Sequence, residues 1–232
     1  MDYSQDRLRD FLKWDIGTWK HALLYWDVVL AQEKLAGERA LELGAHDGGL
    51  SLFLAEKGMQ VVCSDLNGPS QFAPELFERN GLYKFASFES IDATAIPYAE
   101  NSFEIVIFKS VLGGIGMVHG FAGIEQAMRE IHRVLKPGGL LLFAENQVGS
   151  LLHRQARKHF VSWGRTWLYP SLEQIEGLMA PFGESEVRTY GFFSCFKKDF
   201  APFTALDKLI CTSLKSRSHY MAFGHARKAA IG

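Results

Sequence analysis

Residues 39–58 constrain the fold of this chain more than any other stretch. An apolar run, residues 39–43, stops at a turn rich in glycine, and a second apolar run follows and ends at Gly58. This pattern predicts a buried strand, a tight turn and a helix that Gly58 closes as a left-handed cap. Backbone N–H groups at such a helix start point outward, and glycine allows close approach to the main chain, so the turn predicts a small-ligand site.

The next strand indicates which ligand this is. Residues 60–65 form a β-branched run that ends in Asp65, about twenty residues beyond the first glycine of the turn, where an acid in an open α/β sheet binds a ribose hydroxyl. A dinucleotide site favours G-x-G-x-x-G, whereas this turn carries His46 and Asp47. Asp47 would repel a pyrophosphate, while Glu42 and Asp47 would attract a cationic nucleoside that has no phosphates.

With these features the chain resembles the class I S-adenosylmethionine-dependent methyltransferases over residues 39–146. The family's motif acidic-x-G-x-G-x-G matches at Glu42, Gly44 and Gly48, with His46 in place of the middle glycine. The family's ribose acid falls on Asp65. Residues 92–104 match the loop that follows an adenine-binding Asp, and residues 133–139 reproduce the family's RVLKPGG turn. Four motifs in order make the resemblance specific.

The resemblance implies an α/β fold: a Rossmann-like, doubly wound, seven-stranded mixed sheet of order 3-2-1-4-5-7-6, with the last strand antiparallel and helices on both faces. We expect residues 1–36 to form a helical lid and residues 37–232 the Rossmann-like domain, with 147–170 as a substrate-side insertion. The hydrophobic pattern predicts helices at 4–13, 17–35, 121–135, 171–180 and 204–216 and later strands at 103–108, 140–144, 186–193 and 220–225.

The resemblance also implies S-adenosyl-L-methionine as the cofactor and S-adenosyl-L-homocysteine as the product. The expected cofactor contacts are Glu42, Gly44, Ala45, His46, Gly48, Asp65, Leu66, Asp92, Ala93, Lys109 and Trp19. For Trp14 and Trp19 two interpretations remain: one of them covers the cofactor as part of a lid, or they belong to a helix packed on the sheet edge.

The composition limits the partners. A net charge of -1 gives no reason to expect nucleic acid, and the three cysteines show no metal-ligand spacing, so no metal is expected. We see no signal peptide and no run of ~20 apolar residues, and therefore expect a cytoplasmic protein. The oligomeric state is left open.

Three residues are candidate bases, in the order Glu145, His119 and Lys109. Glu145 follows the predicted fifth strand, where it would accept a proton or cap a helix. His119 lies in a predicted loop, where a histidine is either solvated or catalytic. Lys109 ends the fourth strand, where it faces either the substrate or a structural carboxylate.

The acceptor is expected beside the basic, aromatic residues 150–169. The candidate acceptor contacts are Asn146, His153, Arg157 and Trp163, because arginine binds anionic oxygens and aromatic rings stack on sugars. We therefore predict methyl transfer to a small molecule or a saccharide, with O-methylation favoured. A solvated basic face explains the segment as well. An NAD-dependent oxidoreductase and a non-catalytic methyltransferase-like partner protein are the alternatives.

Overall fold

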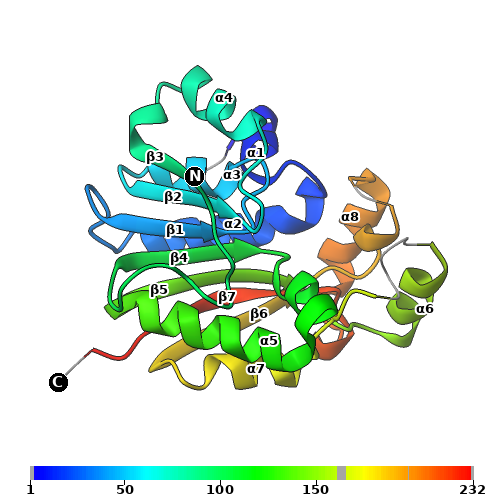
Figure 1. Cartoon of the computed structure of the whole chain (residues 1–232). Coiled ribbons are helices and arrows are strands. Elements are labelled where there is room, and N and C mark those ends of the chain that lie inside the picture. The colour runs from blue at the N-terminus through cyan, green and yellow to red at the C-terminus, as the bar shows by residue number, and fades with distance from the viewer. Residues whose placement is uncertain (1–2, 161–165, 198, 231–232) are drawn as a thin grey trace.

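The computed structural model describes residues 3–160, 166–197 and 199–230. A seven-stranded sheet of order β3-β2-β1-β4-β5-β7-β6 lies at its centre (Figure 1). The first five strands pair in parallel, whereas β7 runs antiparallel to both β5 and β6. The predicted order and the antiparallel last strand are confirmed. The strands are β1 (Arg39–Leu43), β2 (Gln60–Asp65), β3 (Ala86–Ser90), β4 (Phe103–Lys109), β5 (Leu135–Asn146), β6 (Glu184–Tyr190) and β7 (Met221–Arg227).

Helices cover both faces of the sheet and one of its ends. In Figure 1, α5 and α7 lie in front of the sheet, α2 and α3 lie behind it, and α6 and α8 lie where β1, β4 and β5 end. The helices are α1 (Gln5–Leu12), α2 (Ile16–Leu30), α3 (Gly49–Ala55), α4 (Phe72–Arg79), α5 (Leu112–Val134), α6 (Leu151–Phe160), α7 (Leu172–Met179) and α8 (Ala201–Ile210). Short 3₁₀ turns occupy Tyr83–Phe85, Ser194–Phe196 and Ser216–Ser218.

Neighbouring residues of the central strands enter two separate cores. Ile105 and Ile107 of β4 pack with α1, α2 and α3, whereas Val106 and Phe108 pack with α5 and α7. Successive side chains of a strand point to opposite faces, so a continuous apolar run is what a strand covered on both faces requires. This arrangement leaves the carboxyl ends of the strands as the open edge of the sheet.

Helix α2 belongs to the packed layer. Trp19 and Trp26 are both fully buried, and Trp26 Nε1 donates to the carbonyl of Gly224 in β7 at 2.9 Å. Trp19 packs edge-on against Trp14 and Tyr220, with ring centroids 5.2 and 6.4 Å apart. The expected cofactor contact of Trp19 is therefore corrected: its ring lies in the core, and the interpretation of a helix packed on the sheet describes it.

Helix α5 begins earlier than the pattern predicts. It starts at Leu112 and continues past Gly120, whose φ of 65° and ψ of -168° mark a kink, so His119 lies in a helix and not in a loop. Three glycines lie in the first turns of α5, at positions 113, 114 and 116, and glycine weakens a helix. The carboxylate of Glu145 caps the helix start through Val111 and Leu112 and offsets that weakness.

Other boundaries moved less. Helix α2 ends at Leu30 and not at residue 35, and β6 ends at Tyr190 and not at residue 193. In the part of the chain that the structure describes, no helix is both long and apolar enough to cross a membrane.

Candidate active site

One large cavity opens at the carboxyl ends of the parallel strands. Its volume is about 1170 Å³, above the ~300–1,000 Å³ typical of small-molecule sites, so it has room for two ligands. Lining residues 10–119 form what we call the cofactor half, and lining residues 146–220 form the acceptor half. Of the expected site residues, the cavity wall contains Glu42, Gly44, Ala45, His46, Asp65, Leu66, Asp92, Ala93, Lys109, His119, Asn146, His153 and Arg157.

The glycine turn reaches the cavity with a strained backbone. Gly44 and Gly48 have φ of 67° and 78°, and His46 has φ of 49°, a left-handed conformation that favours glycine or a short polar residue. A Cβ at Gly44 would lie 2.5 Å from a methyl group of Val111. The expected cofactor contact of Gly48 is corrected: Gly48 is the N-cap of α3, lies near Cys63 and does not line the cavity.

Asp65 ties the second strand to this turn. Its Oδ2 accepts the backbone N–H of His46 at 2.9 Å, and its Oδ1 accepts that of Leu66 at 2.8 Å. The half-buried carboxylate still lines the cavity, and each oxygen keeps a lone pair for a hydroxyl. The arrangement suits a vicinal diol such as that of ribose.

Glu42 lies beneath the turn. It is 3 % exposed, and its Oε2 accepts the backbone N–H of Ser51 at 2.6 Å in the first turn of α3. Burial raises the pKa of Glu42 to about 7 against the opposing effect of that hydrogen bond. Glu42 therefore changes charge near neutrality at the wall of the cavity.

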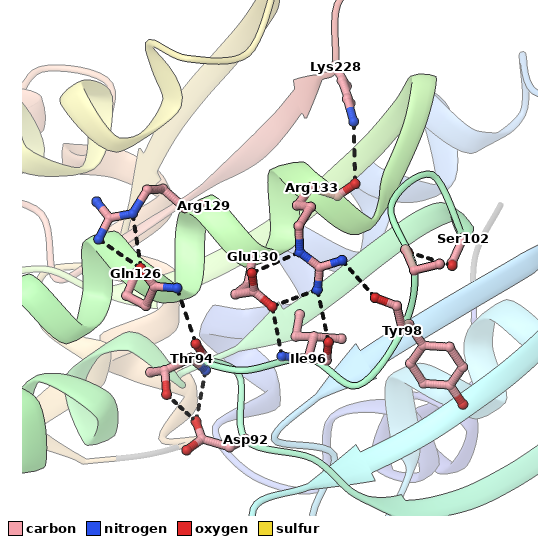
Figure 2. Close-up of polar contacts among 11 residues, drawn as sticks. Asp92, Thr94, Ile96, Tyr98, Ser102, Gln126, Arg129, Glu130, Arg133 and Lys228 are labelled. Carbon is pink, nitrogen blue, oxygen red and sulfur yellow. Dashed lines mark hydrogen bonds and ion pairs between the residues drawn. The ribbon is translucent and has the colours of Figure 1, made fainter.

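Asp92 begins the loop between β3 and β4. Its Oδ1 accepts the backbone N–H and the hydroxyl of Thr94 at 2.8 and 2.7 Å, as Figure 2 shows. The backbone hydrogen bond from Thr94 lowers the pKa of Asp92, so this carboxylate stays charged. His119, which is exposed on α5, contributes to the same lowering of the pKa of Asp92.

Arg133 fixes that loop on α5. Its guanidinium donates to the carbonyls of Tyr98 at 2.7 Å and Ile96 at 2.9 Å, while Glu130 accepts the N–H of Ile96 at 2.9 Å (Figure 2). Two sequence motifs, the RVLKPGG turn and the loop after Asp92, are therefore joined by hydrogen bonds from Arg133. The sequence analysis recognised both motifs but did not predict that they contact each other. The polar residues that both motifs contain were the available signal for this contact.

The end of α1 closes the other side of the turn. Lys13 forms an ion pair with Asp47, whose Oδ1 also contacts His46 Nδ1 at 2.7 Å. The charge that we expected to repel phosphates is thus paired with a lysine. A Cβ at Gly49 would overlap the carbonyl oxygen of Phe11 and lie 2.7 Å from that of Asp10, so α1 needs glycine there.

Lys109 faces the cofactor half and contacts α1. Its Nζ donates to the carbonyl of Leu12 at 3.1 Å and lies 4.0 Å from the centroid of the Trp14 ring. Trp14, between α1 and α2, lines the cavity, whereas Trp19 and Trp26 of α2 do not.

Glu145 does not reach the cavity. It is fully buried, its Oε2 accepts the N–H groups of Val111 and Leu112 at 2.8 and 2.7 Å, and its Oε1 accepts that of Asn146 at 2.9 Å. Burial raises the pKa of Glu145 to about 7. Because the backbone occupies both oxygens, the structure corrects the predicted base to a cap of α5, where the helix N-terminus favours negative charge.

The acceptor half is aromatic, with one buried cation. Arg157 and His153 of α6 point into it beside Tyr169 and Tyr220. Asn146 Nδ2 donates to Ser110 Oγ at 2.8 Å at the boundary between the halves. Exposed residues of the same basic segment are Arg154, Lys158 and His159, and the predicted contact Trp163 lies outside the described residues.

His153 is held by its neighbours. Its Nδ1 accepts the backbone N–H of Ser150 at 3.1 Å, so Nε2 carries the proton and donates to the carbonyl of Phe192 at 2.8 Å. Burial lowers the pKa of His153. With both nitrogens engaged, this histidine positions α6 and is not a free base.

Trp167 lines the acceptor half and was not among the candidate contacts, and its neighbour Leu168 packs on α5. A Cβ at Gly113 would overlap Trp167 Nε1, and one at Gly116 would lie 2.7 Å from Leu168 Cβ. The glycines after β4 therefore admit the 166–170 segment against α5. The high density of glycines after β4 was the sequence signal that could have predicted this contact. Within residues 3–160, 166–197 and 199–230, no group of three or more His, Cys, Asp or Glu side chains could hold a metal ion.

Comparisons with known proteins agree with this geometry. The model of the family described as "Methyltransferase domain" matches residues 41–143. The chain is 36% identical to a demethylmenaquinone methyltransferase from Thermus thermophilus over 121 residues, 51% of either chain. It is 25% identical to the ubiquinone/menaquinone biosynthesis C-methyltransferase UbiE of Yersinia pestis over 177 residues, 65% of this chain and 68% of that one.

Among solved structures, a Haemonchus contortus phosphoethanolamine N-methyltransferase 2, bound to phosphomonomethylethanolamine and S-adenosylhomocysteine, superposes with a TM-score of 0.64 at 21% identity. The match covers 91% of this chain and 53% of that one, and at this identity it shows the fold. The chain spans about half the length of its Thermus relative. The ordered motifs, the strand order and the family model agree, and residues 41–143 of this chain are similar to the class I S-adenosylmethionine-dependent methyltransferases.

Proposed function

We propose that this protein transfers the methyl group of S-adenosylmethionine to a small organic acceptor that is an enol or phenol. The observation that carries the proposal is the single cavity with two dissimilar halves. The cofactor half presents Asp65 and Asp92 to an adenosine, and the acceptor half presents aromatic walls and Arg157. The sulfonium supplies the leaving group, so the protein contributes mainly alignment, for which ~7–11 kcal/mol of the barrier is available.

The choice of acceptor follows from the bases that the acceptor half offers. Its described lining residues include no carboxylate, His153 is engaged at both nitrogens, and burial raises the pKa of Cys195 to about 12. A sugar hydroxyl needs a base for attack, whereas an enol or phenol ionises near neutrality more readily. Its anion offers both an oxygen and a carbon, so O-methylation and the C-methylation named for UbiE are both accessible.

The test is transfer of label. Purified protein is incubated with methyl-labelled S-adenosylmethionine and a metabolite extract, and mass spectrometry identifies the compound that gains the label. We expect a phenol or enol. Label on a saccharide would overturn the acceptor class, and displacement of S-adenosylhomocysteine by NADH would restore the oxidoreductase alternative.

A further inference from the structure

The acceptor half contains a buried guanidinium that forms no ion pair with a described residue. Arg157 is 8 % exposed, and no described carboxylate lies within salt-bridge distance of its guanidinium. A guanidinium remains protonated inside proteins, and burying a charge is costly unless it is paired. Elsewhere in the described chain, half-buried arginines such as Arg7 and Arg227 have carboxylate partners.

Two different kinds of contact hold this guanidinium. Its Nη1 donates to the carbonyls of Gln147 and Val148 at 2.7 and 2.9 Å, which fixes the plane of the group. The ring centroids of Tyr169 and Tyr220 lie 3.9 and 5.6 Å from its Cζ. The rings stabilise the charge through their faces, but they accept none of the in-plane N–H groups.

The remaining edge of the guanidinium has no hydrogen-bond partner among the described residues. Nη2 is buried and has no hydrogen-bond partner, although Arg157 lines the cavity. Buried N–H groups without partners are rare in native proteins, because each costs its full desolvation. A fixed, planar donor edge at a cavity wall is suited to an oxyanion, which accepts charge-assisted hydrogen bonds in that plane.

We propose that Arg157 binds an oxyanion of the acceptor, so that the substrate of this enzyme is an anionic aromatic or enolic compound held by Nη2 and enclosed by Tyr169, Tyr220 and Phe196. This inference rests on the proposed function. A carboxylate, a phosphate and a phenolate share the required chemistry. A phenolate would place the reacting oxygen itself at Arg157, whereas a carboxylate or phosphate would hold the acceptor by a group remote from the methyl.

The experiment compares pairs of probes that share a benzene ring and differ in the charge of its substituent. Calorimetry on protein saturated with S-adenosylhomocysteine measures benzoate against benzamide, phenyl phosphate against phenyl methyl ether, and 4-nitrophenolate against 4-nitroanisole. We expect the anion of at least one pair to bind about tenfold or more tightly than its neutral partner, because hydrogen bonds to charged groups are the strong ones. The preferred pair identifies the oxyanion. No preference in any pair, including no binding at all, overturns the proposal.

Two variants of α6 localise the effect. Arg157→Gln should abolish the preference for the anion and leave the affinity for S-adenosylhomocysteine unchanged. Arg154→Gln, at an exposed position one turn away, should change neither. A preference that survives Arg157→Gln overturns the assignment. If that variant does not fold, Arg157→Lys keeps the charge but not the fork, and equal binding by Arg157→Lys and the natural protein counts against the site.

Failure of the proposed function is seen separately. If the natural protein does not bind S-adenosylhomocysteine, the cofactor assignment fails, and the same probe pairs are measured on the ligand-free protein. The preference for an anion and its loss in Arg157→Gln then decide the arginine site alone.

Discussion

The two halves of the cavity are built in different ways. In the cofactor half, acids at or near strand ends bind backbone N–H groups close to them in the sequence: Asp65 binds the N–H of Leu66, Asp92 that of Thr94, and Glu42 that of Ser51. In the acceptor half the contacts join distant segments. Arg157 packs on Tyr220, and Trp167 fits against Gly113.

Because of this difference we expect the cofactor half to be rigid and the acceptor half to tolerate substitution. Short-range hydrogen bonds to the backbone fix the acids whether or not a ligand is present, so the cofactor half is preorganised. Aromatic contacts between α6, the 166–170 segment and β7 determine shape without fixing any one chemistry, and substitution there changes the acceptor before it changes the fold. Breaking the cofactor half should therefore cost stability or cofactor affinity.

The largest effect is expected at the junction of α1 and the glycine turn. Gly49→Ala places a Cβ against the backbone of Phe11, and backbone gives way less easily than a side chain. We expect a loss of about 3 kcal/mol in the free energy of unfolding, measured by urea denaturation. The control is Gly177→Ala in α7, where a Cβ meets nothing within 4 Å and the helix should gain slightly. Equal stability of both variants would mean that α1 does not depend on Gly49.

Removing the carboxylate of Asp65 should act on the cofactor more than on the fold. Asp65→Ala leaves the N–H of His46 without its partner and removes the expected acceptor for the ribose. We expect the affinity for S-adenosylhomocysteine to fall by about 2 kcal/mol, roughly thirtyfold, in calorimetry. Asn67→Ala, at an exposed position just after β2, is the control. Unchanged affinity of Asp65→Ala would remove the ribose assignment.

The loop clamp is expected to be weaker. Arg133→Ala frees the carbonyls of Ile96 and Tyr98, whereas Arg129→Ala, one turn earlier on α5, removes only contacts to Gln126 (Figure 2). We expect the first variant to lose about 1.5 kcal/mol of stability and to speed amide exchange in residues 94–98, and the second to lose less than about 0.5 kcal/mol. If the two variants exchange alike, Arg133 does not hold the loop.

How far the sequence predicts each half follows from the same difference. The sheet order followed from the resemblance to the family, whereas the glycine turn and the position of Asp65 at the end of β2 followed from strand periodicity and a motif of a few residues. Glu145 was predicted as a base and is a helix cap, since its partners Val111 and Leu112 lie 34 and 33 residues away. The position of this carboxylate at the end of a strand was predicted correctly. Only the tertiary structure shows which N–H groups donate to its oxygens.

The acceptor half was less predictable for a related reason. Arg157 and His153 were singled out as members of a basic, aromatic segment, yet composition could not separate them from the exposed Arg154 and Lys158. Helical phase does separate them, because the residues that point inward from α6 are four apart. The prediction for Trp19 was wrong for a different reason. This large aromatic residue was assigned to the cofactor, but α2 packs on the sheet and buries it in the core.

The smallest effect is expected from the charge of Glu42 in the cofactor half. Because burial raises the pKa of Glu42 to about 7, this group is mostly neutral at pH 6 and mostly a carboxylate at pH 8. The affinity for cationic S-adenosylmethionine should therefore rise across this interval by about 1 kcal/mol, roughly fivefold. The stability of the ligand-free protein should fall as the pH rises from the ordinary glutamate pKa of 4.5 to the raised pKa of about 7 and level off above it, because in that interval the folded protein holds a proton that the unfolded chain has lost. Glu42→Gln keeps an acceptor for the N–H of Ser51 and should flatten the pH dependence of the affinity, whereas the stability keeps the contribution of Glu145, whose pKa burial also raises to about 7. A rise in affinity that persists in Glu42→Gln would assign the titration to another group, and the cofactor half would then attract the sulfonium through its shape and backbone alone.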